Sequence, residues 1–265
     1  MILGGIMRNL IYYDKSKFDI YFRKISKKYA KANKSEIYIK DIDKFNIRNS
    51  IVTFEVKDFL IKPLDMPLDN YINDRVLNSV KFYFNNHNDD VLYDYFLLDS
   101  DVNIGQVKIL LYAMKIQSDV QKILNYIDKS YLVVRPLQFI MLEYISYKFN
   151  LSDGILINKI DKNTYNFIVF KKFLILFNEY VNEINPSNIG KYVDEKLSKV
   201  REDFKININK NVYFLNDNPS FYPNSYDFNF KFINYTMEEI LTKHDYVRSK
   251  FSKFWKKREN FKKNA

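Results

Sequence analysis

The hydrophobic positions along this 265-residue chain follow two periods, one typical of strands and one typical of helices. Short runs rich in Ile, Val, Tyr and Phe predict strands at residues 9–13, 19–24, 37–39, 51–56, 91–98, 107–114, 131–134, 154–158, 165–170, 173–177, 212–215 and 228–233. Apolar residues at helical spacing predict helices at 69–84, 118–127 and 137–148, and another after Pro186. Thr236 and Glu239 have the spacing of a capping box, which predicts a last helix that runs to about residue 261.

The order of these elements is similar in the two halves of the chain. In each half strands come first, and a helix with a following strand comes after them. No low-complexity linker separates the halves, and the boundary between them is predicted near residues 150–153. The pattern therefore predicts an α/β protein whose two halves share one outline.

Composition excludes several kinds of chemistry. The chain has no cysteine, which excludes disulfides, zinc ribbons, iron–sulfur clusters and thiol nucleophiles. Its two histidines, His87 and His244, are too few for a histidine-rich metal site. No apolar run approaches the roughly 18 residues of a membrane-spanning helix, and the first residues lack the basic region of a signal peptide. The expected location is therefore the cytoplasm.

Charge is concentrated at the two ends of the chain. The net charge is +10, yet residues 8–34 and residues 241–265 each carry +7, so residues 35–240 carry −4. A slightly acidic body with two basic ends fits an anionic partner, either a membrane surface or a nucleic acid. The alternative is that both ends are solvated and only keep the protein soluble.

Residues 59–146 carry a resemblance to a known family. An extended segment, 59–69, leads into the helix 69–84, and a strand reading Val-Leu-Tyr-Asp-Tyr-Phe-Leu-Leu follows at 91–98. The strand 107–115, the helix 119–127 and the strand and helix at 132–142 complete the order. In this order and pattern the chain resembles PilM, the actin-like protein of type IV pilus and competence machines, and the cytoplasmic domain of GspL from type II secretion.

The resemblance implies an actin-like (ribonuclease H-like) fold with duplicated mixed sheets and flanking helices. It implies a first subdomain at residues 1–150, with a small subdomain inserted at about 35–100, and a second subdomain at residues 151–265. It also places vestigial nucleotide-binding positions on two hairpins, at Asp14 and Ser16 on the first and at Asp161 and Thr164 on the second. The adenosine-side loop would fall near residues 216–218.

All three loops lack the glycines that the family normally has there. Such loops hold phosphates through closely approaching backbone N–H groups, often at positive φ, and a side chain obstructs that approach. The five glycines of the chain lie elsewhere, at Gly4, Gly5, Gly105, Gly154 and Gly190. We therefore expect weak or absent ATP binding, no hydrolysis and no cofactor.

Other candidate chemistry is sparse. An acidic cluster is formed by Asp89, Asp90, Asp94, Asp99 and Asp101. Such groups could serve a metal or an acid–base pair, but their place around a predicted strand favours a solvated acidic edge. His87 lies in a polar turn, and His244 lies on the last predicted helix as a packing or surface residue. No G-x-S-x-G motif indicates a serine hydrolase.

The last predicted helix is basic and aromatic. Its far end is a candidate membrane or partner surface that consists of Phe254, Trp255, Lys256, Lys257, Arg258, Lys262 and Lys263. A basic amphipathic helix with aromatic residues suits an anionic membrane surface. The alternative is a closing helix whose aromatic face packs on the body of the protein.

The leading functional prediction is a non-enzymatic scaffold at the cytoplasmic side of an inner membrane. The resemblance implies that it holds the cytoplasmic tail of a bitopic, PilN-like partner in a groove near residues 40–100. The alternative is a basic nucleic-acid-binding protein of mobile-element origin, which the two basic ends allow but the −4 body disfavours. An unrecognised small-molecule enzyme is the third alternative.

Overall fold

The computed structural model describes residues 9–14, 17–25, 30–38, 50–85, 91–101, 104–126, 133–160, 164–182, 188–216 and 227–241. Contacts divide the chain into two compact units. The first unit consists of Met1–Val56, Ile116–Ile145 and Thr236–Lys256, and the second consists of Lys57–Lys115, Ser146–Tyr235 and Lys257–Ala265. Each unit is described by itself below.

The N-terminal sheet belongs to the first unit and has five strands in the order β3-β2-β1-β4-β8. An antiparallel meander is formed by β1 (Asn9–Asp14), β2 (Lys17–Ile25) and β3 (Ala30–Tyr38). The strands β4 (Ser50–Phe54) and β8 (Val133–Pro136) continue the sheet in parallel with β1. Leu10, Ile11, Ile51 and Val52 are buried because β1 and β4 are central strands with both faces covered.

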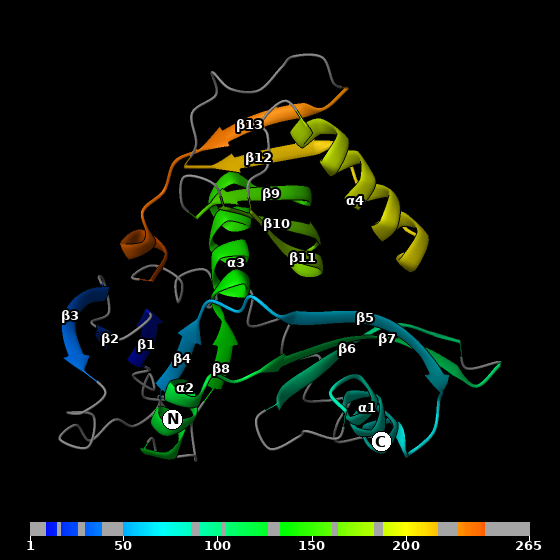
Figure 1. The fold of residues 1–265 in the computed structure, drawn as a ribbon, viewed down its shortest axis with the longest axis horizontal. Helices are drawn as coiled ribbons and strands as arrows, with labels where there is room; N and C mark the ends of the chain where they lie inside the picture. Colours follow the sequence, from blue (N-terminus) through cyan, green and yellow to red (C-terminus); the bar gives the residue numbers. More distant parts are fainter. Residues whose placement is uncertain are drawn as a thin grey trace, which may run out of the picture. The chain divides into compact units, whose positions relative to one another are not determined.

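The C-terminal sheet belongs to the second unit and repeats this arrangement (Figure 1), in the order β11-β10-β9-β12-β13. Its meander is β9 (Asp153–Lys159), β10 (Thr164–Lys171) and β11 (Leu174–Asn182), and its parallel strands are β12 (Asn211–Leu215) and β13 (Asn229–Ile233). Both sheets thus have the same strand order and the same strand directions. The similar outline of the two halves that the sequence predicts is a structural duplication.

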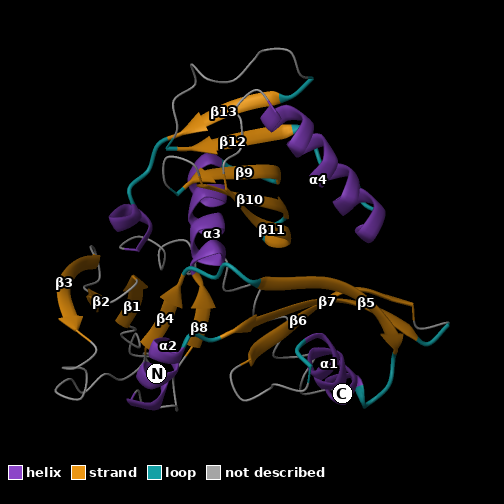
Figure 2. Ribbon diagram, viewed as in Figure 1, coloured by secondary structure: helices purple, strands orange, loops and turns teal. Residues whose placement is uncertain are grey.

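The inserted sheet lies in the chain between β4 and β8 and belongs to the second unit. Its strands are β5 (Phe59–Pro67), β6 (Val91–Asp101) and β7 (Gln106–Lys115), in the antiparallel order β5-β7-β6. The helix α1 (Ile72–Tyr83) covers one face (Figure 2) and buries Val76 and Val80 against Ile109, Leu111 and Ala113 of β7. The opposite face carries Tyr112, whose hydroxyl donates to the carbonyl oxygen of Ile175 on β11, at 2.8 Å.

Three further helices follow the predicted spacing. The helix α2 (Ser118–Tyr126) begins at the predicted Ser118, and α3 (Leu137–Phe149) is apolar nearly all round. The helix α4 (Ile189–Phe204) is the helix predicted after Pro186 and connects β11 to β12. Its buried stripe includes Ile189, Val193, Leu197, Val200 and Phe204. It ends at Lys205, which adopts the left-handed conformation, with φ at 56°. None of the helices among the residues described is both long and apolar enough to cross a membrane.

The structure corrects several sequence predictions. Strands were predicted here only at 19–24 and 37–39, yet β2 extends to Ile25 and β3 begins at Ala30, within the basic stretch 24–34. An edge strand tolerates such a composition because lysine is a common residue at sheet edges. Asp99 and Asp101 were placed in a loop, whereas β6 extends through both residues to form a long hairpin with β7.

Candidate functional site

The first predicted phosphate hairpin is the turn between β1 and β2. Asp14 is the last residue of β1 and pairs with Lys17 of β2, so the two strands form an antiparallel hairpin. Ser16 lies outside the described residues. The hairpin that the resemblance requires is therefore present at the predicted position.

The second predicted phosphate hairpin is the turn between β9 and β10. The Ile160 N–H donates to the Thr164 carbonyl oxygen, at 2.9 Å, and closes this turn. The Thr164 hydroxyl donates to Oδ1 of Asn182 on β11, at 3.1 Å, so it is already engaged within the sheet. Asp161 lies outside the described residues. The first half of the chain and the second half therefore each have a hairpin at the corresponding strand pair.

Tyr235 joins the ends of β9 and β12 in the second unit. Its hydroxyl donates to Oδ1 of Asn158 near the end of β9, at 3.0 Å, and its N–H donates to Oδ1 of Asn216 just after β12, at 2.8 Å. Tyr235 and Asn158 are each only 8% exposed. Asn158 precedes the second hairpin and Asn216 begins the predicted adenosine-side loop. One tyrosine therefore ties together two strand ends from which nucleotide loops would start.

Asn216 adopts a backbone conformation that favours glycine. Its φ is 55°, in the left-handed region that asparagine tolerates better than most other residues. Its N–H donates to the carbonyl oxygen of Ile233, at 3.0 Å, while its side chain binds Tyr235. The backbone and the side chain of Asn216 are therefore both used for internal contacts.

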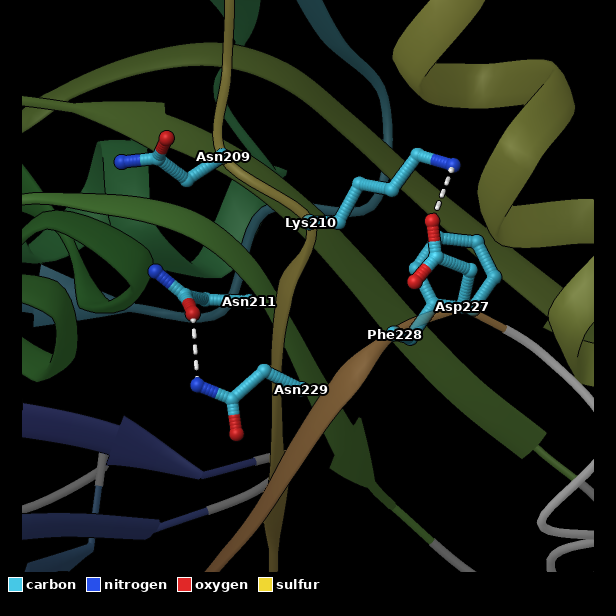
Figure 3. Close-up of a pocket in the computed structure, with 6 residues that line it drawn as sticks. All are labelled: Asn209, Lys210, Asn211, Asp227, Phe228 and Asn229. Carbon is cyan, nitrogen blue, oxygen red and sulfur yellow. Dashed lines mark hydrogen bonds and ion pairs between the residues drawn. The ribbon is translucent and has the colours of Figure 1, made fainter.

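A shallow hollow of about 460 Å³ lies at the opposite ends of the C-terminal strands, where β12 and β13 begin (Figure 3). It is lined by Asn209, Lys210, Asn211, Asp227, Phe228 and Asn229. Asn229 Nδ2 donates to Asn211 Oδ1, at 3.0 Å, and Lys210 Nζ lies 3.6 Å from an Asp227 carboxylate oxygen. Most of the polar groups thus bind one another, and they form no nucleophile–base pair.

The base of this region is fixed by Asp153 and Gly154 at the start of β9. Asn209 Nδ2 donates to both carboxylate oxygens of the buried Asp153, at 2.8 and 3.0 Å. Gly154 has φ at +137°, and a Cβ atom there would lie 2.5 Å from the Asn211 carbonyl oxygen. Both residues are therefore used in packing β9 against β12.

A second polar cluster fixes α4 on β11. The Tyr192 hydroxyl donates to the Glu179 carboxylate, and Lys196 Nζ lies 3.2 Å from Glu179 and 3.1 Å from Glu195. Burial, and then Glu179, raise the pKa of Tyr192. Burial alone would lower the pKa of Lys196, but the two glutamates outweigh it and the pKa is raised. Both groups therefore keep their ordinary protonation states at neutral pH and serve to hold the helix.

Among the residues that the structure describes, no His, Asp and Glu side chains form a cluster able to hold a metal ion. Asp94 and Asp99 of the predicted acidic cluster lie on β6, and both are exposed. His87 and His244 lie outside the described residues, as do Phe254, Trp255, Lys256, Lys257, Arg258, Lys262 and Lys263. The predicted membrane or partner surface at these C-terminal residues stays a prediction.

No protein-family model matches the chain, and no curated protein matches it in sequence. Among solved structures, a chain of the PilM–PilN type IV pilus biogenesis complex is similar with a TM-score of 0.53. The similarity covers 91% of this chain and 95% of that chain, at 9% identity. The chain has an actin-like fold. This confirms the fold class that the sequence pattern and the resemblance predicted.

Two other structures are similar at lower TM-scores. A Bacteroides thetaiotaomicron protein with an actin-like ATPase fold gives 0.47, at 12% identity, over 83% of this chain and 87% of that one. The cytoplasmic domain of EpsL, an inner-membrane component of the Vibrio cholerae type II secretion system, is similar with a TM-score of 0.49 and 7% identity. The similarity covers 91% of this chain and 94% of that chain.

Sequence reasoning predicted the strands beside both hairpins but missed the contacts of Tyr235. A hydrophobic residue directly before a capping box is typical of a staple that packs on the helix, so the sequence signal at Tyr235 indicates packing. Its two asparagine partners lie 77 and 19 residues away in the sequence. Only the strand order of the C-terminal sheet, which places β9 beside β12, brings these residues together.

Proposed function

We propose that this protein is a non-enzymatic, actin-like scaffold of a type IV pilus or type II secretion-like assembly platform. It binds the cytoplasmic tail of a bitopic inner-membrane protein, and it works at the cytoplasmic face of that membrane without hydrolysing ATP. The observation that carries the proposal is the duplicated sheet with its three-stranded insertion, which aligns over nearly the full length of a chain from the PilM–PilN complex.

The ends of β9 and β12 support the absence of nucleotide chemistry. Tyr235 donates one hydrogen bond to Asn158 and another to Asn216, where an actin-like ATPase would start its phosphate and adenosine loops. Breaking these contacts would leave buried polar groups unpaired, at a cost of about 1–3 kcal/mol for each group. A nucleotide would therefore have to displace an already satisfied network, and its loops would lack glycine.

The partner prediction is tested with any protein that is encoded next to this chain and has a short cytoplasmic segment before one transmembrane helix. A fluorescently labelled peptide of that segment is titrated with the full chain, and anisotropy is measured. We expect saturable binding in the micromolar range, with a scrambled peptide and a DNA duplex as controls. No binding of the tail at tens of micromolar would contradict the scaffold proposal, and steep salt-dependent binding of the duplex alone would favour a nucleic-acid-binding protein.

The absence of nucleotide binding is tested separately by calorimetry with magnesium and ATP. We expect no heat of binding with about 100 µM ATP, a concentration within the ordinary KM range of about 1 µM to 1 mM. A dissociation constant in the low micromolar range would show that the loops hold a nucleotide without glycine. That result would remove the non-enzymatic part of the proposal and leave the partner prediction intact.

A further inference from the structure

The strand β6 forms one edge of the inserted sheet, since the strand order is β5-β7-β6. The other edge strand, β5, contains Pro63 and Pro67, which lack the N–H that a neighbouring strand would need. The eleven residues of β6 contain no proline. Edge strands without such protection are the places where a protein adds a further strand. The inserted sheet can therefore be extended at β6 but not at β5.

The two faces of β6 differ in chemistry. Val91 and Tyr95 pack into the core beneath α1, so Tyr93 and Leu97 lie on that same face, and they are 42% and 46% exposed. Asp94 pairs with Tyr112 of β7, and after a shift in register Asp99 pairs with Lys108. Both aspartates thus lie on the opposite face, and both are exposed. Leu92 and Phe96 share the face of the aspartates but are partly buried, so the exposed side chains there are the two aspartates. The exposed large side chains of the other face, Tyr93 and Leu97, are apolar.

The two aspartates also accept hydrogen bonds from backbone N–H groups of β6. Asp94 Oδ1 accepts the N–H of Tyr95, and Asp99 Oδ1 accepts the N–H of Ser100, both at 2.8 Å. Such N–H groups are the donors that an added strand uses. The carboxylates therefore satisfy the edge when no further strand is present, and they place negative charge beside the added strand when one is.

Charge decides which strand fits this edge. Residues 57–115 carry nine aspartates and six Lys or Arg residues, which gives −3 in a chain whose remaining residues carry +13. A second copy of β6 would bring its own aspartates to the edge, and like charges across paired strands are destabilising. A strand with lysine or arginine opposite Asp94 and Asp99 would be stabilised instead.

We propose that β6 binds an extended segment of a partner protein in which apolar residues alternate with Lys or Arg. Successive residues of a strand point to opposite faces, so the apolar residues would contact Tyr93 and Leu97 while the basic residues contact Asp94 and Asp99. This inference rests on the proposed function, because cytoplasmic segments next to a transmembrane helix are rich in Lys and Arg. The occupant is that segment, bound as a fourth strand of the inserted sheet.

The test titrates a labelled eleven-residue peptide of alternating isoleucine and lysine with the full chain. Binding is measured by the fluorescence anisotropy of the peptide. Its controls are a peptide of the same composition with the isoleucines and lysines in two blocks, and an alternating isoleucine–glutamate peptide. We expect the alternating basic peptide to bind at least about tenfold more tightly than either control, because only its pattern fits both faces. Equal binding of the block peptide would overturn the proposal.

Amino-acid substitutions test whether the peptide binds at β6. The pair Asp94→Lys and Asp99→Lys should weaken binding by about tenfold or more, because two attractive cross-strand pairs become repulsive. Asp74→Lys, on the exposed side of α1, is the matched control with the same kind of charge change and should alter affinity by less than about twofold. Ser100→Pro removes one edge N–H and should also weaken binding. An equal loss in Asp74→Lys would mean non-specific attraction and would overturn the assignment to β6.

Hydrogen exchange separates this proposal from the partner prediction. Bound peptide should slow exchange at the Tyr95 and Ser100 amides and leave β5 unchanged. If the natural tail binds but protects another part of the chain, the β6 site is wrong and the scaffold proposal stands. If the alternating peptide protects β6 but the natural tail does not bind, β6 is a peptide site and the scaffold proposal fails. Light scattering checks self-association, and loss of a dimer in the two-aspartate variant would show that a second copy occupies the edge.

Discussion

The hydroxyl of Tyr112 on β7 donates a 2.8 Å hydrogen bond to the carbonyl oxygen of Ile175 on β11. Tyr112 is 3% exposed, and its ring stacks on Phe59, with 5.6 Å between ring centroids. The bond joins the inserted sheet to the C-terminal sheet within the second unit. Residues 63 positions apart in the sequence are thereby held by one buried polar contact.

Tyr112→Phe keeps the ring and removes this bond, so it isolates the polar contribution. We expect the free energy of unfolding to fall by about 1–3 kcal/mol, because the Ile175 carbonyl group loses its donor in a buried position. Urea denaturation of both proteins measures the difference. A change below about 0.3 kcal/mol would mean that this contact does not contribute to stability.

The same tyrosine predicts a loss of stability at alkaline pH. Burial raises the pKa of Tyr112 well above its ordinary value of 10.0. The stabilisation is therefore complete below pH 10 and is lost as pH rises toward the folded-state pKa, because only the unfolded chain readily loses the proton. The stability difference between wild type and Tyr112→Phe should shrink between pH 10 and pH 11 in urea denaturation. A constant difference across that range would contradict the assignment.

Gly154→Ala should be strongly destabilising. The residue has φ at +137°, and an added Cβ would lie 2.5 Å from the Asn211 carbonyl oxygen. We expect a loss of about 3 kcal/mol or more, or a failure to fold, because backbone strain and overpacking both contribute. Gly105→Ala is the matched control, since its φ of +61° is also positive but no atom lies within 4 Å of the new Cβ. It should cost about 1–2 kcal/mol.

Two substitutions at Asn216 separate the effect of its left-handed backbone from the effect of its side-chain hydrogen bond. Asn216→Gly relieves the left-handed backbone but loses the acceptor for the Tyr235 N–H, whereas Asn216→Ala loses the acceptor and keeps the strain. We expect the alanine variant to be about 1 kcal/mol less stable than the glycine variant in thermal or urea unfolding. Equal stabilities would show that the left-handed conformation at this residue carries no strain.

The pair Arg135 and Glu143 should be strongly coupled. Arg135 on β8 donates twice to the Glu143 carboxylate on α3, and the two side chains are only 12% and 9% exposed. Removing one partner, in Arg135→Met or Glu143→Leu, should cost about 3 kcal/mol because the other charge stays buried alone. The double variant should cost less than the sum of the two. A double-mutant cycle from urea denaturation measures this, and strict additivity would rule out the coupling.

Much of the fold could be predicted from local sequence because the apolar periods are clear. The buried stripe of α4 and the start of α2 at Ser118 follow from spacing alone. The strand β3 could not be predicted in full, because a lysine-rich segment becomes a strand only through its place at a sheet edge. The network of Tyr235, Asn158 and Asn216 could not be predicted either, since sequence patterns do not show which strand ends become neighbours.

The chain order of the two sheets has a consequence during synthesis. All strands of the C-terminal sheet lie in one stretch of the sequence, Asp153–Ile233. In the N-terminal sheet, by contrast, β4 ends at Phe54 and β8 begins only at Val133, because the inserted sheet lies between them. The first unit also takes its last segment from Thr236–Lys256, close to the end of the chain. On the ribosome, the first unit therefore begins before the C-terminal sheet is made and still lacks a segment when that sheet is complete, and a chain truncated before Thr236 leaves that unit unfinished.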